Sequence, residues 1–145
     1  MGDIIVDEEP EINILFYSSM IFVTNIYSTI YNQYYIYSFL FLLLTISSLI
    51  YHYPTKNIYA NIFDKICITM VIIYGGVMLY DKTSLDNISY TLVVVLLFLF
   101  VNYLYCFGYC TEQYCFHQNK YIGDVSHAII HITSSIGHHF ITFLR

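Results

Sequence analysis

The chain has 145 residues, of which 58% are hydrophobic and only 10% are charged, and its formal net charge is −5. Soluble domains carry about 25% charged residues, so this composition argues against a water-facing globular surface. It also argues against intrinsic disorder, which needs low hydrophobicity, and against nucleic-acid binding, which needs a basic face. The length suits a single domain.

The first residues, 1–12, are acidic and contain no Lys or Arg. A secretory signal needs a positively charged start, so this segment does not have the character of one. We predict a short solvated tail at 1–12, followed by a single polytopic transmembrane domain at 13–145.

Five apolar stretches follow the tail, each close to the ~20 residues that a helix needs to cross a hydrocarbon core. Polar clusters separate them, and tyrosines gather at their ends as in an interfacial aromatic belt. Lipid offers backbone groups no hydrogen-bond partners, which favours helices. We therefore predict an all-α integral membrane bundle of about five transmembrane helices. The sequence does not identify the membrane, and the basic residues are too few to define the orientation. The stretches are Ile14–Tyr31, Tyr35–Tyr51, Ile62–Tyr80, Ile88–Tyr105 and Val125–Leu144.

Two of these stretches carry residues that suggest close helix packing. The first contains several polar residues, from Ser18 to Thr29, so we expect it to pack against other helices rather than face only lipid. The third contains Gly75-Gly76, which permits a close helix approach or a kink.

Ionisable residues inside membrane segments are costly and usually functional. His127 and His131 are spaced i,i+4, which lets two imidazoles on one helix reach one metal ion. Zinc requires three or four such ligands, and His52 at the end of the second stretch is the candidate for the third. With five spans, the second helix ends where the third and fifth begin. His52, Asp64, His127 and His131 would then lie in one leaflet.

Three imidazoles with an open fourth position are typical of a catalytic zinc site. Zinc lowers the pKa of its bound water to about 7, which provides a hydroxide nucleophile at neutral pH. Asp64 is the candidate general base. Ser48, one turn before His52, is a candidate to stabilise an oxyanion or to orient His52. Such a site faces the bilayer, so the expected substrate is a lipid amide or ester.

These residues, in this order, resemble the CREST superfamily of membrane hydrolases, which includes alkaline ceramidases, progestin and adipoQ receptors and hemolysin III-like proteins. The resemblance rests on Ser48-Leu-Ile-Tyr-His52, on Asp64 at the start of the third helix, and on His127-Ala-Ile-Ile-His131 in the last. It implies Zn²⁺ held by His52, His127 and His131, with Asp64 and Ser48 beside it. The family has seven helices, so this chain would be a shortened version of a CREST-type fold.

Each residue also has a simpler interpretation. His127 and His131 could form hydrogen bonds between helices, and Asp64 could pair with Lys65 at a helix start. Ser48 could bond a carbonyl one turn back. His138 lies about 10 Å deeper than His131 by helix rise, so we predict a packing or hydrogen-bonding role for it.

The cysteines do not match a zinc-finger spacing. Cys106, Cys110 and Cys115 precede the last stretch and could be unpaired thiols or form a loop disulfide, and Cys67 is predicted to be a packing residue.

The leading functional hypothesis is a zinc-dependent, ceramidase-like intramembrane hydrolase. Two alternatives remain open: a haem-b protein with His52 and His127 or His131 as axial ligands, and a non-enzymatic receptor-like or scaffolding protein that retains a structural zinc. A homo-oligomer is also possible, and the sequence does not decide whether a second copy replaces the two helices that the CREST resemblance leaves absent.

Overall fold

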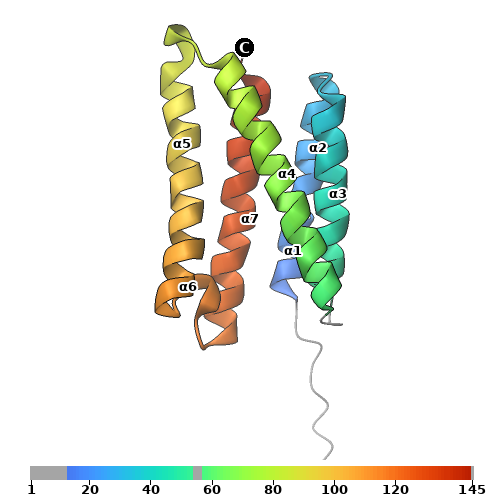
Figure 1. The fold of residues 1–145 in the computed structure, drawn as a ribbon, viewed down its shortest axis with the longest axis vertical. Coiled ribbons are helices and arrows are strands. Elements are labelled where there is room, and N and C mark those ends of the chain that lie inside the picture. The colour runs from blue at the N-terminus through green and yellow to red at the C-terminus, as the bar shows by residue number, and fades with distance from the viewer. Residues whose placement is uncertain (1–12, 54–56, 145) are drawn as a thin grey trace, which may run out of the picture.

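The computed structural model describes residues 13–53 and 57–144, and within these ranges the secondary structure is helical, with no strand. The predicted acidic tail at 1–12 lies outside the described residues. The described chain forms five rods that stand side by side (Figure 1). The main helices are α1 (Ile14–Ser19), α2 (Phe22–Tyr31), α3 (Tyr35–Tyr51), α4 (Ile58–Lys82), α5 (Ile88–Asn102), α6 (Gly108–Thr111) and α7 (Lys120–Phe143).

The first rod consists of α1 and α2, joined through Met20 and Ile21 by a tight turn. Here the backbone bonds run from Met20 N to Tyr17 O and from Ile21 N to Ser18 O, a spacing of three residues. Ser19 Oγ also donates to Leu15 O at 2.8 Å. Serine hydroxyls that bond back to the preceding turn bend helices, which explains the break at this point.

Within the described ranges, three helical segments are long and apolar enough to cross a membrane: Ile14–Tyr31, Ile58–Lys82 and Leu85–Thr111. The last of these runs from a short 3₁₀ turn through α5, a π-helical segment at Tyr103–Phe107 and α6. The helix α3 is apolar but has 17 residues. The helix α7 has 24 residues, but its four histidines and several hydroxyl groups lower its hydropathy.

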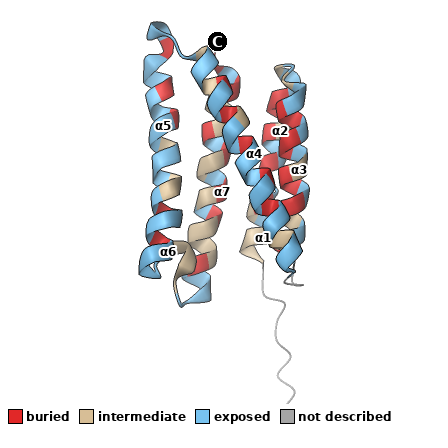
Figure 2. Ribbon diagram, in the orientation of Figure 1, coloured by how far each residue is buried: buried red, intermediate tan, exposed pale blue. Residues whose placement is uncertain are grey.

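The core lies where α3 faces α2 and α4. Tyr37, Phe41 and Val71 are almost completely buried there. The helix α5 packs mainly against α7, and most of its surface is exposed (Figure 2). The hydrophobic side chains exposed on the bundle far exceed what a water-soluble monomer shows, which is compatible with a protein embedded in a membrane.

Most polar residues of the first rod are buried against other helices, as predicted, although Thr24 is exposed. Asn25 forms two hydrogen bonds with Ser135 of α7: its Nδ2 donates to Ser135 O at 3.0 Å, and its Oδ1 accepts from Ser135 Oγ at 2.6 Å. Thr29 is fully buried as well. Burial of these groups in an apolar bundle is tolerable because each has a partner.

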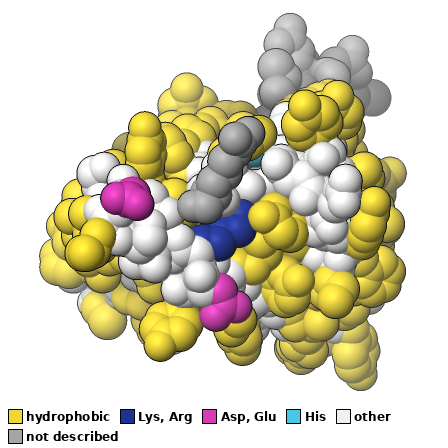
Figure 3. All heavy atoms as spheres, turned by 90° about the horizontal axis from the view of Figure 1, so that it is seen from above, with side chains coloured by type: hydrophobic (Ala, Val, Ile, Leu, Met, Phe, Trp, Pro, Cys, Tyr) yellow, Lys and Arg dark blue, Asp and Glu magenta, His cyan; other side chains and the backbone are white. Residues whose placement is uncertain are grey.

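The end of the bundle near the carboxyl terminus carries charged side chains among hydrophobic ones (Figure 3). Lys82 Nζ donates to the carbonyls of Ile141, Thr142 and Leu144 at 2.8–3.2 Å and lies over the ring of Tyr34. A cation at this place satisfies carbonyls that have no partner within α7 and complements the helix dipole.

Gly75 permits a close approach of α4 to α3 and α7, as predicted. A Cβ at this position would lie 2.5 Å from Tyr37 Oη and 3.1 Å from His138 Cε1. Gly76 has no such neighbour within 4 Å. Only the first glycine of the pair is therefore required by packing.

Candidate metal centre

Three chain segments converge at the end of the bundle where the described chain begins. The helix α3 ends there, α4 begins there, and α7 begins there after the connection from α6 (Figure 1). Asn57 caps α4 by accepting from Tyr59 N, and Asn119 caps α7 by accepting from Tyr121 N and Ile122 N. These caps fix where the two helices start and therefore which of their turns lie at the level of the end of α3.

The structure brings His52, His127 and His131 into one group. Each offers a ligand nitrogen, and these atoms lie within 4.8 Å of one another. The ring centroids are 5.2 Å apart for His52 and His127, 5.4 Å for His52 and His131, and 4.9 Å for His127 and His131. This arrangement can hold a metal ion, as the spacing in the sequence predicts.

The unpaired ring nitrogen of His52 supports a metal site. Nε2 of His52 is buried and has no hydrogen-bond partner among the described residues. Buried polar side-chain atoms nearly always have a partner, so an orphan here requires an explanation. A metal ion shared with the two histidines of α7 would satisfy it. Neutral imidazoles are also the ligands that divalent transition metals take most often.

Asp64 is buried, with 4% of its surface exposed, in the second turn of α4. Its Oδ1 accepts a hydrogen bond from Ser47 Oγ at 2.9 Å. The carboxylate is not part of the group of close ligand atoms. The contact that positions its side chain is therefore the bond from Ser47 of α3.

The i,i+4 spacing suggests that the Ser48 hydroxyl contacts His52, but it contacts Ser19 instead. Its Oγ lies 3.1 Å from Ser19 Oγ of α1, and its carbonyl accepts from His52 N. The hydroxyl that bonds Asp64 belongs to Ser47, which the sequence motif does not include. Ser47 and Ser48 are both buried, so each supports a separate contact of α3.

Helix α1 adds contacts that the sequence analysis missed. Ser18 Oγ lies 2.8 Å from Nδ1 of His131, and the Asn13 side chain donates to the carbonyl of His52. The only signal for them in the sequence is the polar character of the first apolar stretch. It indicates helix packing but does not indicate which partner each residue meets.

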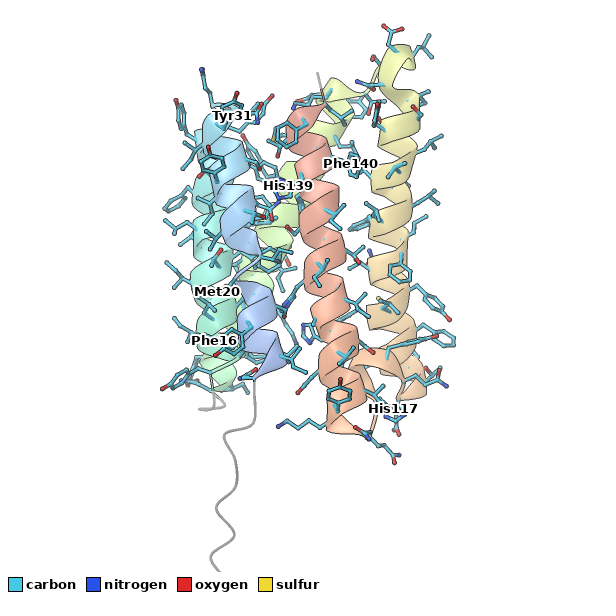
Figure 4. The ribbon with its side chains drawn as sticks, turned by 180° about the vertical axis from the view of Figure 1, so that it is seen from behind. Phe16, Met20, Tyr31, His117, His139 and Phe140 are labelled. Atoms are coloured by element: carbon cyan, nitrogen blue, oxygen red, sulfur yellow. The ribbon has the colours of Figure 1, made fainter. Side chains whose placement is uncertain are left out.

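The other two histidines of α7 lie outside the group. Nδ1 of His138 forms a hydrogen bond with the Tyr37 hydroxyl, which agrees with the predicted hydrogen-bonding role. Nε2 of His139 lies 2.9 Å from Thr24 Oγ1, between α2 and α7 (Figure 4). All four cysteines are free thiols, so the structure has no loop disulfide, and Cys67 is buried as a packing residue.

No family model, curated protein or solved structure matches this chain.

Proposed function

We propose that the chain is a zinc-dependent intramembrane hydrolase of the CREST type, reduced to five membrane-spanning helices, that cleaves a lipid amide or ester. The observation that carries this proposal is the group of His52, His127 and His131, whose ligand atoms lie within 4.8 Å of one another. Three imidazoles bound to zinc leave a fourth position for water or substrate. Zinc at this site would supply a Lewis acid and a water with a pKa of about 7.

The residues around the histidines have roles in such a reaction. Asp64 is the group that would accept a proton from the attacking water, and the bond from Ser47 fixes the orientation of its carboxylate. Ser48 supports the end of α3 through Ser19, so it would act by positioning the turn that carries His52.

A lipid substrate is supported by an apolar groove at the same end of α3 as His52, although none of the three histidines lines it. A shallow groove of about 250 Å³ is lined by Phe16 of α1 and by Leu49, Ile50 and Tyr53, which flank His52 in the sequence. The groove is apolar and open on its outer side, so a hydrocarbon chain in the bilayer can occupy it without crossing water.

The geometry favours a metal ion over haem. Two axial histidines lie on opposite faces of a porphyrin, which separates their rings. Here three rings form one group, with centroids no more than 5.4 Å apart, and a metal ion can use all three imidazoles whereas haem would use only two.

The test is metal analysis of the purified protein, combined with turnover of a fluorescent long-chain lipid amide. We expect one zinc per chain in the wild type and its loss, together with turnover, in His127→Ala. His139→Ala is the matched control, because His139 lies on the same helix outside the histidine group and bonds Thr24. Zinc without turnover would support the scaffold hypothesis. A Soret band would support haem, and a metal-free wild type would refute the proposal.

A further inference from the structure

The environment of His131 contains a feature that the metal group alone does not require. Ser18 of α1 bonds Nδ1 of His131 at 2.8 Å, and the same hydroxyl lies 3.1 Å from the carbonyl oxygen of Leu15. A carbonyl can only accept a hydrogen bond, and a serine hydroxyl has one proton to donate. If Ser18 donates to Leu15 O, the proton between Ser18 and His131 must belong to Nδ1 of His131.

This direction decides which nitrogen of His131 is available. A neutral imidazole with a proton on Nδ1 has its lone pair on Nε2. With the opposite direction, Nε2 would carry the proton and could not bind a metal. The Ser18 hydroxyl occupies Nδ1 of His131 in either direction, so Nε2 is the nitrogen that is left for a metal. A metal on Nε2 requires the proton on Nδ1, and Leu15 O, which also accepts from Ser19 Oγ at 2.8 Å, is then the acceptor for the Ser18 hydroxyl.

The same segment holds the ring and the neighbouring ligand in place. The ring of Phe22, four residues after Ser18, lies 5.4 Å from the His131 ring at a tilt of 59°, so an aromatic contact adds to the hydrogen bond of His131. The Asn13 side chain, which caps α1, donates to the carbonyl of His52. The helix α1 packs against both α3 and α7, which carry the two halves of the histidine group.

We infer that the segment Asn13–Ser19 is a structural part of the metal centre. Within it, Ser18 is the positioning residue that fixes the tautomer of His131: Nδ1–H of His131 donates to Ser18 Oγ, and the Ser18 hydroxyl donates to the carbonyl of Leu15. This inference rests on the proposed function, since it assigns a role toward the same metal. It makes α1 necessary for metal affinity although α1 contributes no ligand. Partners of ligating histidines of this kind alter metal affinity by about 10–100-fold.

The experiment measures zinc affinity of the full chain in detergent by chelator competition. We expect Ser18→Ala to weaken zinc binding about 10–100-fold and Ser18→Thr, which keeps the hydroxyl, to restore most of it. Ser28→Ala is the matched control, because the Ser28 hydroxyl is buried in the same rod but donates only to the carbonyl of Asn25. Its affinity should equal that of the wild type.

A second readout separates this inference from the proposed function. In ¹⁵N-histidine-labelled protein without zinc, NMR should show His131 protonated on Nδ1 in the wild type and in Ser18→Thr. In Ser18→Ala the Nε2 tautomer should appear. If the wild type binds no zinc, the proposed function fails and the tautomer alone decides the inference. A His131 protonated on Nε2 in the wild type, or a Ser18→Ala variant with wild-type zinc affinity, would overturn it.

Discussion

Two adjacent glycines of α4 offer a direct test of how the bundle packs. At Gly75 an added methyl group would lie 2.5 Å from Tyr37 Oη and 3.1 Å from a ring carbon of His138. Tyr37 is fully buried and its hydroxyl is bonded to His138, so it cannot swing aside without breaking that bond. At Gly76 the added methyl group would meet nothing within 4 Å.

The expected effects of the two substitutions have opposite signs. Overpacking costs about 1–3 kcal/mol, and loss of the Tyr37–His138 bond adds about 0.5–1.5 kcal/mol. Replacing a helical glycine by alanine contributes about 0.5–1 kcal/mol of stability. We therefore expect Gly75→Ala to lower the free energy of unfolding by about 1–3 kcal/mol and Gly76→Ala to raise it by about 0.5–1 kcal/mol.

The assay is SDS-induced unfolding in mixed micelles, followed by circular dichroism, for both variants and the wild type. The variants have the same composition, so a difference between them reports local packing alone. Equal midpoints for Gly75→Ala and Gly76→Ala would show that α4 does not approach Tyr37 as closely as the structure indicates.

Three further predictions concern other sites. Asp64→Asn keeps the size of the side chain and the oxygen that accepts from Ser47. We therefore expect the variant to retain zinc while its lipid-amide turnover falls about 10²–10⁴-fold. Loss of zinc would instead give Asp64 a structural role. Lys82→Met leaves carbonyls at the end of α7 without a partner and should lower the free energy of unfolding by about 1–3 kcal/mol, measured by the same SDS titration. Burial raises the pKa of the Cys115 thiol to about 11, and maleimide attacks the thiolate. At pH 8, a variant in which Cys115 is the sole cysteine should therefore react at least about ten times more slowly than one in which the exposed Cys110 is the sole cysteine. The rate of the Cys115 variant should rise about tenfold per pH unit. Equal rates for the two variants would contradict the burial of Cys115.

The helices could be predicted from the sequence because apolar runs, and the polar clusters that separate them, determine helices within short stretches of chain. The predicted stretch Tyr35–Tyr51 has the bounds of α3, and Ile14–Tyr31 has the outer bounds of the first rod. The helices α4 and α7 begin earlier than predicted, at Ile58 and Lys120, because an asparagine cap precedes each. A cap satisfies free N–H groups, so a helix begins at the cap rather than where the apolar run begins.

The grouping of the three histidines could be predicted because it depends only on the direction in which the chain runs along each successive helix. A chain that reverses at each connection brings the end of one helix beside the start of the next. Two spans, α4 and the span that contains α5, separate His52 from the start of α7, and this even number returns the chain to the level of His52. The level at which a helix starts depends on chain direction and not on which helices touch, and His52, His127 and His131 do lie together.

The contacts of the two serines on α3 show where such reasoning ends. Successive residues of a helix point about 100° apart, so Ser47 and Ser48 face different neighbours. The i,i+4 spacing to His52 selects Ser48, but α4 covers the face of Ser47 and α1 covers that of Ser48. Spacing within one helix therefore predicts which turn carries the polar groups. The group that each hydroxyl bonds depends on which rod packs against that face, and residues far apart in the sequence determine that packing.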